Sequence, residues 1–171
     1  MNNLILILLF SVVNLFPNET MTDTTTFIIV RHAEKDGTGN DPGLSADGKA
    51  RAEELRRTLA EVPVHAIYST PYQRTRQTVT PLAAEKGIAI TEYAAAKPAG
   101  QFAEELFSAY RGKTVLICGH SNTVPEIVRT LGKTDQPITI DEPHFDNIFI
   151  VTCTENAAPG VLRLKFGKSS R

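Results

Sequence analysis

The sequence predicts an α/β fold, a three-layer α/β/α sandwich with a mostly parallel central sheet. Short apolar runs, typical of strands buried on both faces, alternate along the chain with longer segments of helical periodicity. Such alternation favours helical crossovers that cover both faces of one sheet. With 171 residues, 42% of them hydrophobic, the chain suits one globular domain and is short for two.

The first strand is predicted from Phe27 to Val30, and its charged end is informative. The apolar run leads directly into Arg31 and His32, which cannot stay in the core. We therefore expect both at the carboxyl edge of the sheet, where open α/β sheets bind ligands. With a second cation nearby at Lys35, this imidazole suits a group that meets an anion better than a structural histidine.

The alternation continues along the chain. A helix that Ser45 can N-cap precedes a second buried strand, predicted from Val62 to Tyr68. A third strand, at an edge of the sheet, is predicted from Gly87 to Tyr93. After a fourth strand, two closing strands are expected to form an antiparallel hairpin at one edge, from Ile148 to Thr152 and from Val161 to Phe166.

The helix after the second strand carries two arginines with different expected roles. Because residues four apart share a helix face, Arg74 and Thr78 point the same way, whereas Arg76 points elsewhere. A stray helical arginine is usually a solvated surface cation, and we expect this of Arg76. Arg74 follows a strand-to-helix junction and is a candidate for binding an anion.

A second histidine follows the fourth strand, which is predicted from Thr114 to Cys118. His120 stands between the carboxyl end of this strand and the start of a helix, whose dipole favours a bound anion. The helix start has the spacing of a capping box, with Thr123 as the cap and Glu126 as its partner.

Composition narrows the functional classes. The net charge of −1 gives no sign of general nucleic-acid or membrane-surface binding, so attraction for anions must come from locally placed arginines. No CxxC or HExxH pattern offers a metal site, and no cofactor is expected. Cys118 and Cys153 lie at or beside predicted strands, and we expect buried thiols rather than a disulfide.

The first 22 residues stand apart from the predicted domain at 23–171. Leu4 to Phe16 is an apolar run with the length of a signal-peptide core, too short for a comfortable membrane span. No Lys or Arg precedes the run and no A-x-A-like cleavage site follows it. An export signal, an uncleaved anchor and a misassigned start before Met21 are three interpretations. We favour export, to a periplasmic or secreted location, over a cytoplasmic one.

Four separated segments together resemble the histidine phosphatase superfamily, the phosphoglycerate-mutase-like proteins. They extend from Phe27 to about Val151, and each alone is a weak signal. In chain order they read FIIVRHAEK, LSADGKARAEEL, IYSTPYQRTRQT and VLICGHSNT. The RH pair followed by a small residue corresponds to the RHG-type motif of the superfamily. The resemblance implies a phosphoglycerate-mutase-like fold.

The resemblance also implies roles for the residues at the strand ends. His32 corresponds to the nucleophile, and His120 to a second catalytic histidine that binds the same phosphoryl group. Arg31 and Arg74 correspond to the phosphate clamp, and Lys35 falls where some relatives carry a further phosphate-contacting arginine. Guanidinium forks match phosphate oxygens two at a time, and a neutral imidazole is nucleophilic. Such a site needs no metal for phosphoryl transfer.

The chain departs from many relatives at their general acid. Those relatives carry a glutamate after the third strand, within a longer insertion that covers the pocket. Here Glu92 is the nearest candidate, with Glu34, Glu142 and Asp146 as further possibilities. The short segment after the third strand predicts an open pocket, as in compact bacterial phosphohistidine phosphatases of the SixA type.

The resemblance implies a metal-independent phosphatase, a histidine acid phosphatase-like phosphoric monoester hydrolase. Its substrate would be a phosphorylated small molecule or a phosphoprotein carrying a phosphomonoester or phosphohistidine, processed through a phosphohistidine intermediate. A phosphoglycerate-type mutase is an alternative, although it needs a lid that this short chain has little room for. A non-catalytic phosphate-binding module is another, but it has no need of an intact His32. Without a full acid pattern, activated leaving groups are expected to react faster than alkyl ones.

Overall fold

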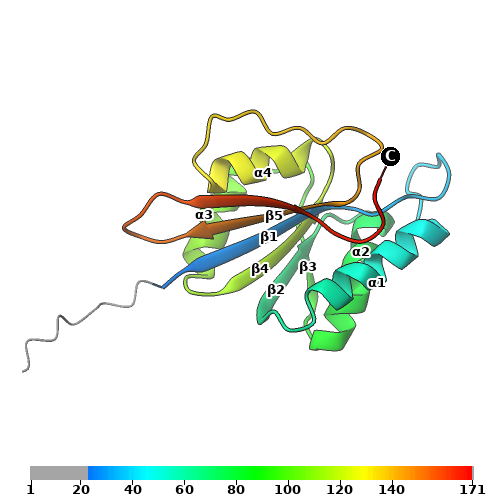
Figure 1. Ribbon diagram of the computed structural model, residues 1–171, viewed down its shortest axis with the longest axis horizontal. Helices are drawn as coiled ribbons and strands as arrows, with labels where there is room; N and C mark the ends of the chain where they lie inside the picture. The colour runs from blue at the N-terminus through cyan, green and yellow to red at the C-terminus, as the bar shows by residue number, and fades with distance from the viewer. Residues whose placement is uncertain (1–22, 171) are drawn as a thin grey trace, which may run out of the picture.

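In the computed structural model, which describes residues 23–170, a six-stranded sheet lies between two pairs of helices (Figure 1). The strands are β1 (Thr25–Arg31), β2 (Val64–Ser69), β3 (Ile90–Glu92), β4 (Thr114–Gly119), β5 (Asn147–Cys153) and β6 (Gly160–Lys165). The helices are α1 (Ala46–Thr58), α2 (Gln73–Lys86), α3 (Ala99–Ala109) and α4 (Thr123–Leu131). The predicted α/β/α class is confirmed. The apolar run Leu4–Phe16 lies outside the described residues.

The sheet has the order β3-β2-β4-β1-β5-β6. β3, β2, β4 and β1 are parallel, whereas β5 is antiparallel to β1 and forms an antiparallel hairpin with β6 at the edge, as predicted. In the parallel part, Arg31 lies opposite Gly119 and Ser69 lies opposite Cys118. The residues that follow β1, β2 and β4 therefore meet at one edge of the sheet.

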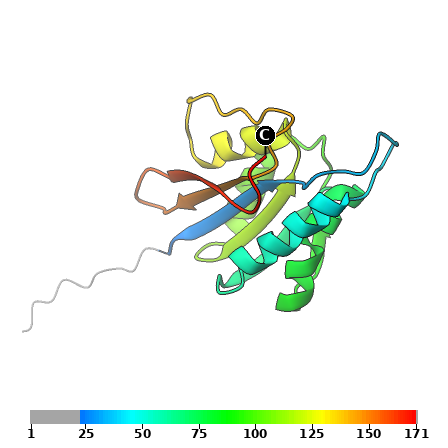
Figure 2. The same ribbon diagram turned by 45° about the vertical axis from the view of Figure 1, so that its right-hand side comes forward.

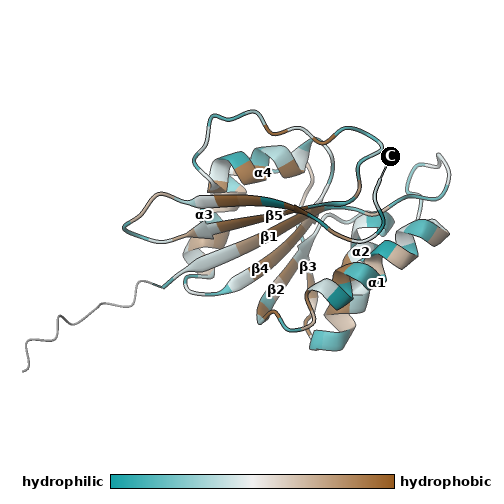
Figure 3. Ribbon diagram, viewed as in Figure 1, coloured by the Kyte–Doolittle hydropathy of each residue, from teal (hydrophilic) through white to brown (hydrophobic). Residues whose placement is uncertain are grey.

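Both faces of β1 are buried, which explains its unbroken apolar sequence. Phe27 and Ile29 pack into the core formed with α3 and α4, whereas Ile28 and Val30 pack into the core formed with α1 and α2. Hydropathy colouring shows the same layering, with apolar strands inside and polar segments along the outer sides of the helices (Figure 3). The strand end is thus anchored from both sides.

Helix α1 begins at the predicted cap. The Oγ atom of Ser45 accepts a hydrogen bond from the Gly48 N–H at 3.1 Å, and the Ser45 N–H donates to the Glu34 carbonyl at 2.9 Å. A Cβ atom on Gly48 would lie 2.1 Å from that same carbonyl oxygen. Glycine therefore lets the helix start press against the loop that follows β1. This segment is scaffold for that loop.

Two local predictions are corrected. β3 begins at Ile90 rather than at residue 87, because Gly87 closes α2 in the left-handed region with φ 65°. The capping box between Thr123 and Glu126 is wrong, since no side chain caps α4. The Oγ1 atom of Thr123 instead accepts a hydrogen bond from the backbone N–H of His120 at 3.0 Å. This bond fixes the turn that carries the histidine.

The connection from α4 to β5, residues 132–146, brings a distant part of the sequence to the same edge. It passes outside α4 and returns to the end of the molecule where β1 finishes (Figures 1 and 2). Because β5 is antiparallel to β1, Ile148 near its start pairs with Val30 near the end of β1. The last residues of the connection therefore lie beside Arg31.

Two further findings concern the thiols and the helices. Cys118 and Cys153 are free and buried, as predicted. Burial raises the pKa of both thiols, so neither is activated as a thiolate.

Between residues 23 and 170, the structure contains no helix with the length and apolar character needed to cross a membrane.

Candidate active site

An open hollow of about 320 Å³ lies at the carboxyl edge of the parallel strands. Residues from the ends of β1 and β4, the start of α2 and the 132–146 connection contribute to it. Its lining comprises Arg31, His32, Lys35, Tyr72, Arg74, Ala95, His120, Ser121, Asn122, Thr123 and Glu142. All five residues that the sequence predicted for a phosphate site are among them.

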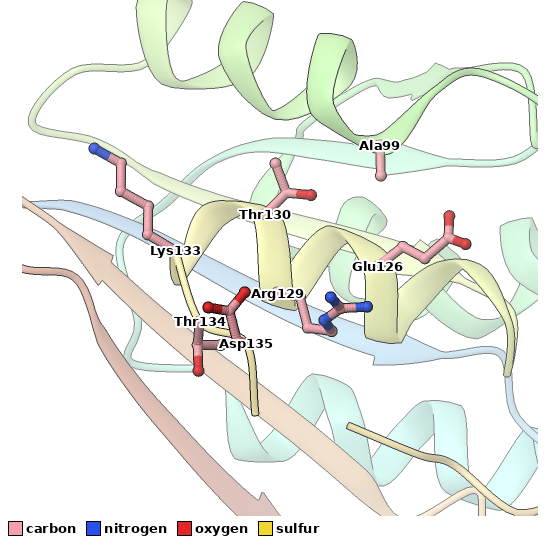
Figure 4. Close-up of a pocket in the computed structure, with 7 residues that line it drawn as sticks. All are labelled: Ala99, Glu126, Arg129, Thr130, Lys133, Thr134 and Asp135. Atoms are coloured by element: carbon pink, nitrogen blue, oxygen red, sulfur yellow. The ribbon is translucent and has the colours of Figure 1, made fainter. Parts of the chain in front are cut away.

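A second hollow, of about 440 Å³, lies along α4 on the other side of the molecule from α1 and α2 (Figure 4). Its charged side chains spread in different directions over the surface rather than converging (Figure 4). It is lined by Ala99, Glu126, Arg129, Thr130, Lys133, Thr134 and Asp135. No strand-end residue reaches it, so the predicted chemistry belongs to the hollow at the sheet edge.

His32 is held as a neutral imidazole with one nitrogen free. Its Nδ1 atom lies 2.8 Å from the Ala33 carbonyl oxygen. A carbonyl can only accept, so Nδ1 carries the hydrogen and Nε2 keeps its lone pair. Burial lowers the pKa of His32 to about 3; the bond to Ala33 opposes this, while the charges of Arg31, His120 and Arg74 add to the lowering. At neutral pH the Nε2 lone pair is available.

The loop that carries His32 is tied to helix α2. The Ala33 N–H donates to the Oγ1 atom of Thr78 at 2.9 Å, and the Thr78 hydroxyl donates to the Arg74 carbonyl at 2.7 Å. Ala33 and Thr78 are both buried. The shared face predicted for Arg74 and Thr78 is confirmed, and it links the turn that bears Arg74 to the histidine.

Arg31 is buried and gripped by the 132–146 connection. Its Nη1 atom donates to the carbonyl oxygens of Asp141 at 3.2 Å and Glu142 at 2.7 Å, and its Nη2 atom donates to the Glu142 carboxylate at 2.9 Å. The guanidinium carbon lies 4.2 Å from the ring centre of Phe145. Nε of Arg31 is buried and has no hydrogen-bond partner among the described residues. This N–H and the second Nη2 hydrogen are therefore available to an anion.

Arg74 faces the hollow from α2 with looser support. Its guanidinium carbon lies 4.5 Å from the ring centre of Tyr72, and its Nη1 atom lies 3.8 Å from an Asp41 carboxylate oxygen. Arg76 points away, forms an exposed ion pair with Glu92 at 3.2 Å and does not line the hollow. The predicted difference between the two arginines is confirmed in their placement.

His120 lies beside His32, with 5.4 Å between the ring centres. Its Nε2 atom is 2.9 Å from Oγ1 of Thr70, which is 2.9 Å from Oγ1 of Thr75. The Thr75 hydroxyl donates its one hydrogen to a backbone carbonyl, that of Thr70 or Tyr72. Thr70 therefore donates to Thr75 and accepts from Nε2–H of His120, which leaves the Nδ1 lone pair unshared.

The electrostatics of His120 follow from the same surroundings. Burial lowers its pKa to about 4, and the charges of Arg74 and Arg31 contribute further to the lowering. The hollow thus combines two neutral imidazoles with two permanently charged guanidinium groups. Because the nucleophilic imidazole is uncharged, it does not offset the positive charge with which the two arginines attract a phosphate.

Three further groups on the rim complete the lining. Lys35 is exposed and borders the hollow, so its phosphate contact stays a prediction. Ser121 and Asn122 lie just before α4, which has no side-chain cap. Their backbone N–H groups are at the positive end of the helix dipole, as expected for additional donors to an anion.

Two of the four carboxylates considered as a general acid are engaged elsewhere. Glu92, the nearest candidate from the sequence, lies at the end of β3 in its ion pair with Arg76 and outside the hollow. Glu34 forms an ion pair with buried Arg51 at 2.7 Å. That pair holds the loop after His32 against α1, so the role of Glu34 is structural.

The other two carboxylates belong to the segment before β5. Asp146 accepts from Nζ of Lys165 at 2.7 Å and from the backbone N–H of Ser170. Among the carboxylates of residues 23–170, Glu142 alone lines the hollow; its Oε2 bonds Arg31 and its Oε1 accepts from the Ser121 hydroxyl at 3.1 Å. Within the described chain, no group of three or more potential metal ligands is assembled.

Sequence reasoning missed Thr70, Tyr72 and Phe145, which shape the site, and named Glu142 only as a further possibility for the acid. Thr70 and Tyr72 lie inside the IYSTPYQRTRQT segment, so their closeness to Arg74 was a usable signal. Glu142 and Phe145 lie in an irregular segment with no periodic pattern. Only the antiparallel pairing of β5 with β1 brings them to Arg31.

Comparison with known proteins shows a family match over part of the chain. Residues 27–97 match the model of the histidine phosphatase superfamily (branch 1). This range includes Arg31, His32, Lys35 and Arg74, while His120 follows it. A search of curated protein sequences finds no match.

Several solved structures share the fold. The protein histidine phosphatase SixA, complexed with tungstate, is 17% identical over 82% of this chain and 96% of its own, with a TM-score of 0.69. A SixA protein from Nakamurella multipartitia is 19% identical over 86% and 98%, with a TM-score of 0.61. Phosphoserine phosphatase from Entamoeba histolytica, with 3-phosphoglyceric acid, is 16% identical over 85% and 98%, with a TM-score of 0.57. Residues 27–97 thus resemble the histidine phosphatase superfamily (branch 1), and the chain shares the fold of the SixA structures.

Proposed function

We propose that the protein is a metal-independent phosphatase that acts on phosphomonoesters or phosphohistidine through a phosphoryl group carried on His32. The observation that supports this most strongly is the state of that imidazole. It is neutral, its Nδ1 hydrogen is fixed on the Ala33 carbonyl, and its Nε2 lone pair is free between two arginines. Such an imidazole is a nucleophile for phosphorus.

The reaction has two displacement steps. In the first, the Nε2 lone pair of His32 attacks phosphorus while the bond to the leaving group breaks, and the leaving group departs with that electron pair and takes up a proton. Arg31 and Arg74 hold the non-bridging oxygens and balance their charge. Nδ1 of His120, whose lone pair is unshared, accepts a hydrogen bond from a phosphoryl oxygen that carries a proton, as in a substrate monoanion. In the second step, water attacks phosphorus and loses a proton, and the P–N electron pair returns to Nε2.

The shape of the site and the names of its structural neighbours support a phosphorylated substrate. The hollow is open at the sheet edge, so it can admit a phosphoryl group carried by a bulky molecule. One neighbour is named as a protein histidine phosphatase and another as a phosphoserine phosphatase. We therefore expect a phosphorylated small molecule or a phosphoprotein as the partner, without assigning which.

The test is a substrate panel of an aryl phosphate, a sugar phosphate, phosphoserine and a phosphohistidine protein. We expect phosphate release from at least one of these, unchanged by EDTA. His32→Ala should reduce the rate at least about 10³-fold, as expected when a covalent nucleophile is removed. Retained activity in His32→Ala, or loss of activity in EDTA, contradicts the proposal.

The same panel separates the two alternatives from the sequence. A mutase would transfer the phosphoryl group between hydroxyls of phosphoglycerate without releasing phosphate. A binding module would bind phosphate or sulfate and turn over none of the substrates. Either result would replace the phosphatase proposal.

A further inference from the structure

We infer that Glu142 is the general acid of this site, the residue that protonates the leaving group as its bond to phosphorus breaks. The inference builds on the proposed phosphatase function and deepens it. It gives alkyl phosphates, whose leaving groups need a proton, a place among the substrates. The sequence placed the best candidate acid at Glu92 instead.

The position of Glu142 is set by two residues of the hollow. Its Oε2 atom bonds Nη2 of Arg31 at 2.9 Å, and its Oε1 atom accepts from the Ser121 hydroxyl at 3.1 Å. Arg31 ends β1 and Ser121 precedes α4, so the carboxylate spans the rim between these two elements. Its side chain is 76% exposed, so it can exchange protons with solvent.

The geometry of Arg31 brings this carboxylate close to a bound phosphoryl group. Both Nη1 contacts go to backbone carbonyls, and one Nη2 hydrogen goes to Glu142. The buried, unpaired Nε and the other Nη2 hydrogen are left for the substrate. Two oxygens that accept from one nitrogen at about 2.9 Å lie about 5 Å apart. The leaving oxygen is bonded to the same phosphorus, so Glu142 reaches it directly or through one water, the distance that proton transfer requires.

Binding of the substrate favours protonation of the Glu142 carboxylate. In the free protein, the hydrogen bond from Arg31 holds the pKa of Glu142 below its usual range, with smaller contributions from Ser121 and Lys35. A phosphoryl dianion on the same Nη2 opposes this, because two anions that share one cation favour uptake of a proton. The charged and titratable groups that line the hollow with this carboxylate are Arg31, Lys35, Arg74, His32, His120 and Tyr72.

Over one catalytic cycle, Glu142 gives up one proton and takes up one proton. In the first step, the P–O bond breaks, its electron pair stays on the leaving oxygen, and the carboxylic acid of Glu142 gives that oxygen its proton. In the second step, the carboxylate accepts the proton that the attacking water loses. Glu142 is thereby restored to its acid form, and no other reactant is needed.

The test compares Glu142→Gln with Glu92→Gln in the full chain. The two substitutions are chemically identical, but Glu92 is paired with Arg76 outside the hollow. General acid help is worth about 10²–10⁴ in rate for a poor leaving group. We expect Glu142→Gln to lower kcat/KM for a sugar phosphate at least about 100-fold and for 4-nitrophenyl phosphate less than about 10-fold. Glu92→Gln should match the wild type on both.

A second measurement uses anion binding alone. Sulfate binding, followed by calorimetry in two buffers of different ionisation enthalpy, counts the protons taken up near neutral pH. Sulfate itself stays a dianion there, so any proton enters the protein. We expect Glu142→Gln to take up fewer protons than the wild type and Glu92→Gln to take up the same number. Equal uptake by all three proteins overturns the inference.

The kinetic outcomes each decide one question. If Glu142→Gln lowers kcat/KM by the same factor on both substrates, the residue only positions Arg31. If it raises kcat/KM by the same factor on both, its carboxylate only competes with phosphate. Wild-type protein that cleaves the aryl but not the sugar phosphate has no acid. Each of these results overturns the inference while the phosphatase function stands. Wild-type protein that cleaves nothing rejects the phosphatase function, and sulfate-linked proton uptake then decides the role of Glu142 separately.

Discussion

Arg31 and Arg74 face the same hollow, yet the protein supports their guanidinium groups differently. The Arg31 side chain is 3% exposed, and three hydrogen bonds from the connection before β5 fix its orientation. The Arg74 side chain is 17% exposed and has a stacking contact with Tyr72 and a 3.8 Å ion pair with Asp41. One wall of the site is therefore rigid before substrate arrives, and the other can adjust to it.

The two arginines also differ in how far along the sequence their contacting residues lie. The contacts of Arg74 with Tyr72 and Thr78 come from its own helix start, within a few residues. The contacts of Arg31 come from residues 110 and 111 positions away. Apart from the Asp41 ion pair, local sequence specifies the adjustable wall, whereas the tertiary fold specifies the rigid one.

Replacing each arginine by lysine should separate the two most clearly. A lysine at 31 cannot both satisfy the two carbonyls and present a planar fork to phosphate. We expect Arg31→Lys to lower kcat/KM about 100-fold, the cost of losing a preorganised donor. Arg74→Lys keeps a charge at a site open to solvent and should lose about 10-fold, the worth of one charged hydrogen bond.

The matched control is Arg76→Lys, on the same helix as Arg74 but outside the hollow. A surface substitution of this kind changes rates by no more than about twofold. Steady-state kinetics with 4-nitrophenyl phosphate measures all three variants. Equal losses for Arg31→Lys and Arg74→Lys would show that the two walls are equally rigid.

A smaller effect concerns the two histidines. Among the charges, Arg31 is the first cause of the lowered pKa of His32, and Arg74 is the first for His120, although burial is the largest cause for both. Removing a nearby cation favours the imidazolium and raises the pKa by about one unit. Arg31→Gln should therefore raise the pKa of His32 more, and Arg74→Gln that of His120 more.

NMR titration of the imidazole signals measures these shifts. In the wild type, both groups should stay neutral as pH falls from 7 to 5, since their values lie near 3 and 4. Consequently the pH profile of kcat/KM should show no fall with a midpoint near pH 6.5, the pKa of an unperturbed histidine. Both variants should still titrate below 6.5, because burial is retained. If both variants shift the pKa values of His32 and His120 by the same amounts, each histidine does not depend mainly on one arginine.

Much of the fold and of the phosphate site could be predicted from the sequence. Unbroken apolar runs identify strands buried on both faces, and the polar residues that end them must emerge at the sheet edge. This reasoning places Arg31, His32 and His120 together, as the structure has them. Helical spacing adds Arg74 and separates it from Arg76.

The rim of the site could not be predicted in the same way. Glu142 lies in an irregular connection, and no periodicity relates it to β1. Glu92 ends β3 and pairs with Arg76 outside the hollow. At Thr123, the hydroxyl that fits a helix cap serves the backbone of His120 instead. In each case a tertiary contact decides between partners that the sequence leaves equivalent.

Trapping a phosphoenzyme tests directly whether His32 carries the phosphoryl group. Wild-type protein is mixed with 4-nitrophenyl phosphate, quenched in alkali within milliseconds, and digested for mass spectrometry. We expect one phosphoryl group on His32, stable in alkali and labile in acid as a phosphoramidate is, and none on His32→Ala. A phosphoryl group on another residue, or turnover with no phosphoenzyme at any quench time, would contradict it.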